Sequence, residues 1–369
     1  MRLIKKIIKL SLSIVVYWSG LLSLFAFLKR IFLPYGDLVI LMYHSVLDFG
    51  EEERECLQPG LIVSQQIFDK QMSYLARNHN LLSLEQLIEL LKNNKPIPKR
   101  TVVITFDDGW RDNYLYAYPI LKKYRVPATI FLPTDFVGTH KIFWFLQVKL
   151  LLAGGNFPSE KLAGILEKVK EENKTSLSAG SLNSLDIDSI GGDADNFIEK
   201  MKHLDFEVIQ KVIDSMIAES GIPQDERTKK RWVLSWDEVM EMNQNNIDFG
   251  SHGQSHRILT ALSTDEVRQE LVESKNIIEE ETGKKVHLFS YPNGDYNSEL
   301  KKLVQEAGYR CAVTIKGCEE KEKEPDLFAL RRIGVHEDVS TDLKGKFSEA
   351  LFASNINGWN NFLKKYHKS

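Results

Sequence analysis

The sequence predicts an α/β fold, namely an incomplete or distorted (β/α)7 barrel with a helical insertion and an N-terminal membrane anchor helix. Three observations support this prediction. Short apolar runs alternate with helical segments along most of the 369 residues, which is typical of a parallel sheet or barrel. The alternation stops over residues 137–232, where the sequence turns helical and polar. An uncharged N-terminal stretch completes the pattern, so we divide the chain into an anchor, residues 1–33, and a second domain, residues 34–369.

The N-terminal segment is predicted to cross a membrane. Four basic residues among the first nine precede an uncharged stretch from Leu10 to Leu28, which Lys29 and Arg30 close. A membrane-spanning helix needs about 20 apolar residues, and no small-residue cleavage signal follows the stretch. The basic excess upstream predicts a cytoplasmic N-terminus, and hence a cell-membrane protein whose second domain is extracytoplasmic. The alternative is a helix that lies on the membrane surface.

The second domain is expected to begin with a strand and to alternate regularly. A serine three positions before a glutamate or glutamine forms a capping box, which predicts helix starts at Ser83, Ser235 and Ser263. Further helices are expected over residues 64–77, 118–123 and 298–307. The apolar runs predict strands over residues 37–44, 101–106, 128–132, 247–250, 286–290, 311–315 and 328–335.

The charge balance argues against a nucleic-acid partner. The chain carries 48 basic and 51 acidic residues, a formal net charge of −3. Proteins that bind nucleic acid normally show a basic excess, because they neutralise phosphates. The sequence gives no indication of an oligomeric state.

Two adjacent aspartates, Asp107 and Asp108, directly follow the predicted strand 101–106, and two histidines, His252 and His256, follow the strand 247–250. In a barrel of parallel strands, side chains at the carboxyl ends of the strands gather at one face. The two histidines and one of the aspartates therefore form a candidate site for a divalent metal with one position open for water. A bound cation would make the two neighbouring carboxylates tolerable. The other aspartate is then a candidate base.

These motifs resemble those of the polysaccharide deacetylases of carbohydrate esterase family four, which share the NodB-like homology domain. Residues Thr105–Gly109 match the first motif of the family, and His252–His256 match its His-x-x-x-His motif. Residues Phe289–Gly294 stand in the place of its third motif. The resemblance covers about residues 38–336 without the insertion, and it points to the exopolysaccharide deacetylases whose strand order is permuted.

The resemblance implies a role for each of the four residues. Asp108, His252 and His256 would hold a divalent metal, most often zinc in this family, and Asp107 would be the catalytic base. The fold implied is the barrel already predicted from the alternation of strands and helices.

The third motif implies contacts with the substrate and also contains a departure from the family. The residues expected to contact the substrate are Tyr291, Pro292 and Asn293. The backbone N–H of Asn293 would stabilise the negative charge that develops on the acetyl oxygen. Ser290 stands where the family usually has an arginine that orients the catalytic aspartate. An arginine of the last strand is expected to replace it, and we favour Arg332 over Arg331.

A general acid is also required, because the departing amine must be protonated, and histidine suits this role near neutral pH. In most relatives this histidine comes late in the chain, which here would be His336. In the permuted relatives the corresponding strand lies at the N-terminus, and the stretch Leu41–Ser45 resembles theirs. We therefore favour His44, since the first and last strands of a barrel are neighbours.

The expected function is metal-dependent hydrolysis of N-acetyl groups on N-acetylhexosamine units of a surface polysaccharide or a lipid-linked glycan. Two alternatives remain at this stage. One is a catalytically inactive, carbohydrate-binding relative with the same fold. The other is a non-haem iron oxygenase, because two histidines and one carboxylate also form the facial triad of those enzymes.

Overall fold

The computed structural model describes residues 2–32, 35, 38–48, 57–153, 157–172, 194–221, 230–316 and 325–360. The chain divides into two compact units. The larger unit contains residues 1–50, 59–138 and 233–369, and the smaller contains residues 51–58 and 139–232. Within the insertion expected at 137–232, residues 154–156, 173–193 and 222–229 lie outside the described ranges.

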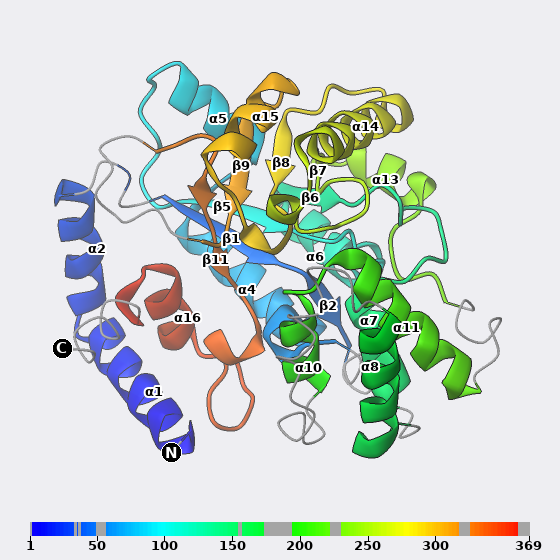
Figure 1. Ribbon diagram of the computed structural model, residues 1–369. Coiled ribbons are helices and arrows are strands. Elements are labelled where there is room, and N and C mark those ends of the chain that lie inside the picture. The colour runs from blue at the N-terminus through cyan, green and yellow to red at the C-terminus, as the bar shows by residue number, and fades with distance from the viewer. Residues whose placement is uncertain are drawn as a thin grey trace. The chain divides into compact units, whose positions relative to one another are not determined.

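The larger unit is built around one sheet of parallel strands, which confirms the predicted α/β barrel (Figure 1). The hydrogen-bonded order is β10-β9-β8-β7-β6-β5-β1-β11, and β4 pairs with β5 beside this path. The strands are β1 (Val39–Tyr43), β4 (Asn80–Leu82), β5 (Thr101–Phe106), β6 (Ala128–Leu132), β7 (Ile247–Ser251), β8 (Leu288–Ser290), β9 (Cys311–Thr314), β10 (Leu330–Arg331) and β11 (Ile333–Gly334). A second, small sheet pairs β2 (Ser45–Leu47) with β3 (Ile62–Ser64).

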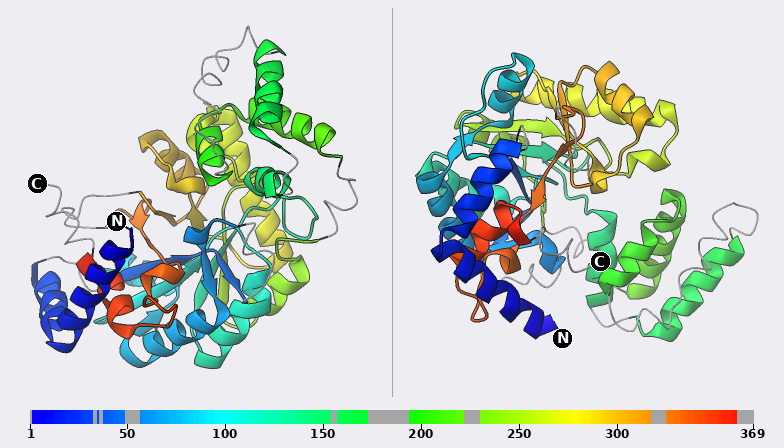
Figure 2. Two further views of the ribbon diagram at one scale, coloured as in Figure 1. Left: turned by 90° about the horizontal axis from the view of Figure 1, so that it is seen from below. Right: turned by 90° about the vertical axis from the view of Figure 1, so that its left-hand side faces the viewer.

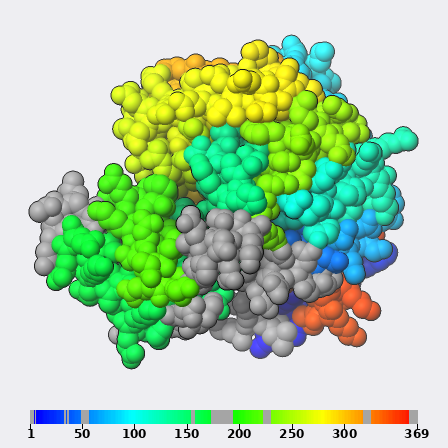
Figure 3. Space-filling model, turned by 90° about the vertical axis from the view of Figure 1, so that its right-hand side faces the viewer, coloured from blue at the N-terminus to red at the C-terminus, as the bar shows by residue number. Residues whose placement is uncertain are grey.

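Helices alternate with these strands. All three predicted capping boxes are present, at Ser83, Ser235 and Ser263. The long helix α14 lies along the face of the molecule shown in Figure 3 (yellow). The helices of this unit are α1 (Arg2–Trp18), α2 (Leu21–Phe32), α4 (Gln65–Asn78), α5 (Leu84–Lys92), α6 (Tyr118–Tyr124), α13 (Trp236–Asn243), α14 (Thr264–Thr282), α15 (Ser298–Glu306) and α16 (Glu349–Ile356).

The last predicted strand, residues 328–335, closes the barrel in two halves. Its first half, β10, pairs with β9, and its second half, β11, pairs with β1. Between them, the backbone N–H of Arg332 donates to the carbonyl oxygen of Thr314 at 2.9 Å. Because β9 and β1 are otherwise the two ends of the sheet, this single segment brings those ends together.

The barrel is filled by apolar side chains and closed at one end by α5. The cluster joins residues from both, namely Ile40, Val103, Phe131, Leu288, Cys311, Val313 and Leu330 of the strands and Leu84, Leu87 and Ile88 of α5. One hydrogen bond and one ion pair place α5 at the amino ends of the strands. Nδ1 of His287, before β8, lies 3.2 Å from Oε1 of Glu85, and Arg310, before β9, pairs with Glu89. At the opposite end of the barrel, where the strands end, lie the polar residues described below.

The expected single helix over residues 10–28 is not present. The segment folds as two helices, α1 and α2, because Gly20 adopts a left-handed conformation with φ +80° and ends the first one. Among the described residues no single helix is long and apolar enough to cross a membrane. The segments Lys6–Trp18 and Leu21–Phe32 reach that length and composition together, and the angle between them is 79°.

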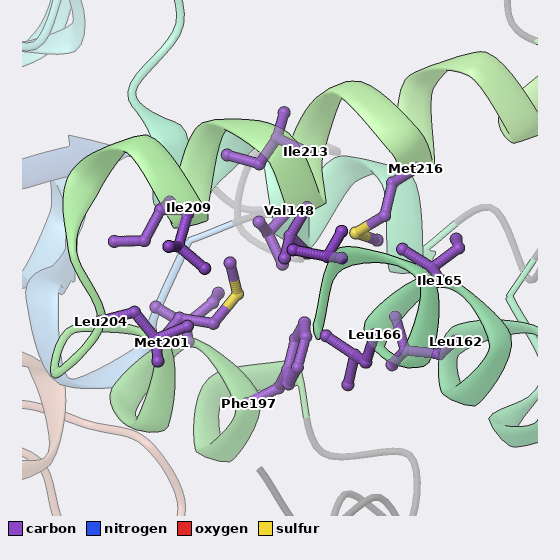
Figure 4. Packing of buried hydrophobic residues seen from close by; sticks show 14 of the residues in the cluster. Val148, Leu162, Ile165, Leu166, Phe197, Met201, Leu204, Ile209, Ile213 and Met216 are labelled. Carbon is purple, nitrogen blue, oxygen red and sulfur yellow. The ribbon is translucent and has the colours of Figure 1, made fainter. Parts of the chain in front are cut away.

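The smaller unit is helical, as its sequence predicts. Its helices are α7 (Trp144–Ala153), α8 (Ser159–Glu172), α10 (Ala194–Met201) and α11 (Phe206–Ser220). Figure 4 shows side chains of these helices pointing toward one another around Phe197 and Met201. This cluster gives the unit an apolar core of its own.

Candidate active site

The predicted site residues converge where the strands of the barrel end. His44 follows β1, Asp107 and Asp108 follow β5, and His252 follows β7. Arg332 lies between β10 and β11. Since all these strands are parallel, their carboxyl ends meet on one side of the barrel, which is the side that carries the chemistry in such folds.

The first aspartate, Asp107, forms a buried ion pair with Arg332. The guanidinium donates from Nη1 to Oδ1 at 2.7 Å and from Nη2 to Oδ2 at 2.6 Å. Nη2 also donates to Oγ of Ser290 at 2.9 Å, and Nη1 donates to Oγ1 of Thr105 at 3.1 Å. Ser290 stands where the family usually has an arginine. Its hydroxyl contacts Arg332, the arginine that binds the aspartate in this protein. The neighbouring Arg331 is exposed and makes no such contact in the described structure.

The second aspartate, Asp108, faces the two histidines. Its Oδ1 lies 3.0 Å from Nε2 of His256 and 3.5 Å from Nε2 of His252. One ligand atom from each of these three residues falls within 4.8 Å of the others. The indole N–H of Trp110 donates to Oδ2 of Asp108 at 3.0 Å. Nδ1 of His252 lies 2.8 Å from the carbonyl oxygen of Ser290, so it carries the proton and leaves Nε2 as an electron-pair donor.

The two aspartates are tolerated side by side because each has its own partners, Arg332 for Asp107 and the two histidines for Asp108. Burial raises the pKa of Asp107, but the charge of Arg332 outweighs this and lowers it overall. Burial also raises the pKa of Asp108, and hydrogen bonds from His252 and His256 hold it well below its usual range. Both carboxylates are therefore charged at neutral pH.

Glycines allow the two loops to approach the site. Gly109 has φ +60°, and a Cβ atom there would lie 2.7 Å from a methyl carbon of Leu132. Gly253 has φ +79°, and a Cβ there would lie 3.0 Å from Oε2 of Glu270. Asp108 and His256 themselves adopt left-handed conformations, with φ of 71° and 58°. A left-handed backbone conformation raises the free energy of residues other than glycine. It persists only where neighbouring contacts hold the residue in that conformation.

Glu270 of α14, which the sequence did not single out, supports the histidine loop. Its Oε2 accepts the backbone N–H groups of Gln254 at 2.6 Å and Ser255 at 3.0 Å, and its Oε1 accepts the hydroxyl of Ser255. Glu270 is buried although it is charged. A buried carboxylate that accepts three hydrogen bonds fixes the loop between His252 and His256.

His44 is held by a second set of residues that the sequence did not single out. Asn113 donates to its carbonyl oxygen at 2.7 Å. Asp112 accepts the backbone N–H of Val46 at 2.9 Å and the hydroxyl of Ser45. Burial lowers the pKa of His44, and the charges of Asp108 and Asp107 oppose this without reversing it. The imidazole is thus within electrostatic reach of both site aspartates.

The alternative histidine, His336, lies in different surroundings. It lines a cavity of about 540 Å³ together with Lys9 of α1 and Asn355 of α16. The short helix that follows it begins at Glu337. His336 therefore borders the helices beside the barrel, whereas His44 interacts with the site carboxylates.

The residues expected to contact substrate are divided between the core and the surface. Tyr291 is buried, and its hydroxyl donates to the carbonyl oxygen of Phe328 at 2.9 Å. Pro292 is buried as well. Asn293 is partly exposed in a left-handed conformation, φ 57°, and its side-chain amide donates to Asp295 at 2.6 Å. Only the backbone of this turn and Asn293 are thus available to a ligand.

The ion pair generates a testable prediction about stability. Arg332→Met leaves the Asp107 carboxylate buried without its partner, which should lower the free energy of unfolding by about 3–5 kcal/mol. Denaturant-induced unfolding at pH 7 measures this value. Adding Asp107→Asn should restore a large part of the loss, because no buried charge is then unpaired. The exposed neighbour provides the control, since Arg331→Met should change stability by less than about 0.5 kcal/mol. Equal stability of Arg332→Met and the parent protein would contradict the assignment.

Comparison with known proteins agrees with this geometry. The family model described as polysaccharide deacetylase matches residues 94–176 and 192–312, more than half of the chain. The chain is 24% identical over 318 residues to YxkH of Bacillus subtilis, whose name places it among the polysaccharide deacetylases; the alignment covers 86% of this chain and 77% of that protein. It is 44% identical over 77 residues to a poly-β-1,6-N-acetyl-D-glucosamine N-deacetylase of Staphylococcus aureus, covering 21% of this chain and 26% of that one.

Solved structures share the fold. The deacetylase PplD of Streptococcus pyogenes, solved in complex with acetate, superposes with a TM-score of 0.52 at 21% identity, covering 82% of this chain and 94% of that one. The polysaccharide deacetylase BC0361 of Bacillus cereus superposes with a TM-score of 0.51 at 19% identity, covering 86% and 68%. The fold, the convergent site and the family match lead to one conclusion: the chain belongs to the polysaccharide deacetylase family.

Proposed function

We propose that the protein removes N-acetyl groups from N-acetylhexosamine units of a surface polysaccharide or a lipid-linked glycan, in a metal-dependent hydrolysis. One observation carries the proposal: Asp107, whose carboxylate Arg332 holds, directly precedes Asp108, one of three residues whose ligand atoms converge. The staphylococcal relative, named for the deacetylation of an N-acetylglucosamine polymer, supports this substrate class.

The residues present fit a divalent cation. Two imidazole nitrogens and one carboxylate oxygen are the ligand set of catalytic zinc sites, which leave further positions open. The hydrogen bond from Nδ1 of His252 to Ser290 and the one from Trp110 to Asp108 orient two of the ligands. Asp108, His252 and His256 would therefore hold the ion, and zinc is the ion we expect. Such a cation supplies a polarising charge for the acetamide carbonyl and acidifies a water molecule.

The protein residues then carry the proton and charge steps. Asp107, oriented by two hydrogen bonds from Arg332, takes the proton from the attacking water. Its lowered pKa keeps it charged and ready to accept at neutral pH. The oxygen of the acetyl group gains negative charge as the carbon becomes tetrahedral, and we expect the backbone N–H of Asn293 to donate to that oxygen.

Collapse of this tetrahedral centre breaks the carbon–nitrogen bond and requires a proton on the leaving nitrogen. We assign this donor role to His44, which interacts electrostatically with Asp107 and Asp108. Acetate and a free amine on the sugar are the products. A facial-triad oxygenase has no support, because the fold is a parallel α/β barrel of the deacetylase family.

We further propose that the enzyme acts outside the cytoplasm, attached to the cell membrane by its N-terminal segment. The motivation for the attachment is the basic and apolar composition of residues 1–32. This location fits a glycan substrate at the cell surface.

The reaction is tested directly by acetate release. The purified, zinc-loaded protein should release acetate from N-acetylglucosamine oligomers, with poly-β-1,6-linked oligomers tested first. Enzymatic quantification of acetate across a panel of linkages measures the preference. The Asp107→Asn protein serves as the inactive control. Failure to release acetate from any N-acetylated glycan, with the metal shown to be bound, would refute the proposed reaction.

The division of roles between the aspartates is tested by metal content. His252→Ala and His256→Ala should each remove the ion, because two ligands do not retain it firmly. Asp107→Asn should keep about one equivalent of metal while turnover falls by roughly 10²–10⁴ or more, the range typical of a lost base. Elemental analysis of the purified variants gives the occupancy. Loss of metal from Asp107→Asn as complete as from His252→Ala would mean that the two aspartates are assigned in the wrong order.

The identity of the proton donor is tested by comparing two histidine variants. His44→Ala should lower turnover by roughly 10²–10⁴ with metal still bound, as expected for a general acid. His336→Ala should have a much smaller effect, because His336 lines a cavity together with Lys9 of α1 and Asn355 of α16. Steady-state kinetics under saturating metal decide between them. A large loss in His336→Ala alone would contradict the assignment of His44.

A further inference from the structure

The helices α1 and α2 present an apolar face to solvent. Figure 2 (right) looks onto these helices (blue), with α16 (red) beside them. The large apolar side chains that are exposed on this face are Ile4, Ile7, Ile8, Leu12, Ile14, Val15, Trp18, Leu21, Leu24, Phe27, Leu28, Ile31 and Phe32. Elsewhere in the described structure the large exposed apolar residues are scattered, for example Leu115, Val272 and Leu343.

The opposite face of the two helices is attached to the barrel unit. Nζ of Lys6 lies 2.8 Å from a carboxylate oxygen of Asp338, and the hydroxyl of Tyr17 donates to Glu349 at 3.4 Å. On α2, the ring of Phe25 makes an edge-to-face contact with Trp359, with centroids 5.2 Å apart. The helices therefore run along the protein and do not project away from it.

This arrangement reverses the amphipathic pattern of a helix on a soluble domain, which turns its apolar face inward. Here the outward face is apolar, and the basic residues Lys6, Lys9, Lys29 and Arg30 lie in partly buried positions at its border. A contiguous apolar surface of this kind marks a site that another apolar phase or partner covers.

The charge of the N-terminal segment indicates what covers the apolar face of α1 and α2. Residues 1–36 contain six basic and no acidic side chains. Behind the bend, a cavity of about 540 Å³ is lined by Arg30 and Arg100 together with Trp18 and Phe27. Apolar side chains on a segment whose own charged residues are all basic match the acyl region of a bilayer bordered by anionic headgroups. A second copy of the same surface would instead bring like charges together.

We propose that α1 and α2 form a membrane seat that lies in the plane of an anionic bilayer. Their outward face enters the boundary between headgroups and acyl chains, while their inward face holds the barrel through the contacts of Lys6, Tyr17 and Phe25. The helices need not cross the bilayer for this, and both ends of the segment stay on the side of the barrel. The inference concerns attachment and does not depend on the proposed deacetylation.

Vesicle binding by the full-length protein tests the seat. Vesicles of phosphatidylcholine with phosphatidylglycerol should bind the protein, and vesicles of phosphatidylcholine alone should bind it more weakly, with binding to the anionic vesicles falling as salt rises. The triple variant Ile8→Ser, Val15→Ser and Leu24→Ser should weaken binding by roughly tenfold or more, because three exposed apolar side chains no longer enter the lipid. Vesicle flotation measures the bound fraction.

A matched triple variant provides the control. Leu115→Ser, Val272→Ser and Leu343→Ser remove three apolar side chains of similar exposure away from the seat, and binding should stay within about twofold of the parent. Thermal unfolding followed by circular dichroism shows that both variants remain folded. Equal binding of the seat variant and the parent, or no binding to anionic vesicles by the parent, would overturn the proposal. So would a dimer that forms through this face in place of vesicle binding.

The side of the membrane on which the N-terminus lies distinguishes helices in the membrane plane from a helix that spans the membrane. An epitope tag placed before Met1 should be removed by protease added outside intact cells or spheroplasts, together with the barrel unit. Protection of the tag while the barrel is digested would show that the segment crosses the membrane, and would overturn the in-plane arrangement. Neither readout requires acetate release, so failure of the seat and failure of the deacetylase proposal are distinguishable.

Discussion

The structure of the site depends on the buried ion pair between Asp107 and Arg332. The arginine sits between β10 and β11, the two halves of the segment that closes the barrel. Its guanidinium reaches across the barrel to the end of β5 and binds both carboxylate oxygens of Asp107. The segment that closes the barrel therefore also supplies the arginine that holds Asp107, the proposed base. A buried carboxylate at this position is tolerable only because the closing strand brings its counter-charge.

The remaining site residues are arranged around this pair by loops under local strain. Asp108 and His256 adopt left-handed backbone conformations, which cost free energy that neighbouring contacts must offset. Glu270 accepts two backbone N–H groups of the histidine loop, and Asp112 performs a similar function for the loop after His44. These carboxylates shape the backbone that holds the site in position. The family match over residues 94–176 and 192–312 includes Asp112, Glu270 and the histidine loop, whereas His44, Ser45 and Val46 lie before it.

The seat formed by α1 and α2 would place this site close to a bilayer surface. Lys6 of α1 contacts Asp338, two residues beyond His336, on the side of the barrel where β11 ends. An enzyme held in this way would meet the proposed substrates, glycans at the cell surface. The attachment and the chemistry use different residues, so each can change in evolution or in the laboratory without the other.

Local sequence patterns predicted the alternation of strands and helices, the capped helix starts at Ser83, Ser235 and Ser263, and the grouping of His252 and His256 with one of the two adjacent aspartates. The grouping follows because strand ends in a parallel barrel share one side, whereas the choice of Asp108 came from the resemblance to the family. The preference for Arg332 over its neighbour Arg331 needed the structure for confirmation, since adjacent residues on a strand point to opposite faces and the sequence does not show which face is inside. The structure also revealed Glu270 and Asp112, whose partners lie 15 to 67 residues away in sequence. The break at Gly20 was also seen only in the structure, because composition describes the apolar content of residues 10–28 but not the left-handed backbone conformation that ends the first helix.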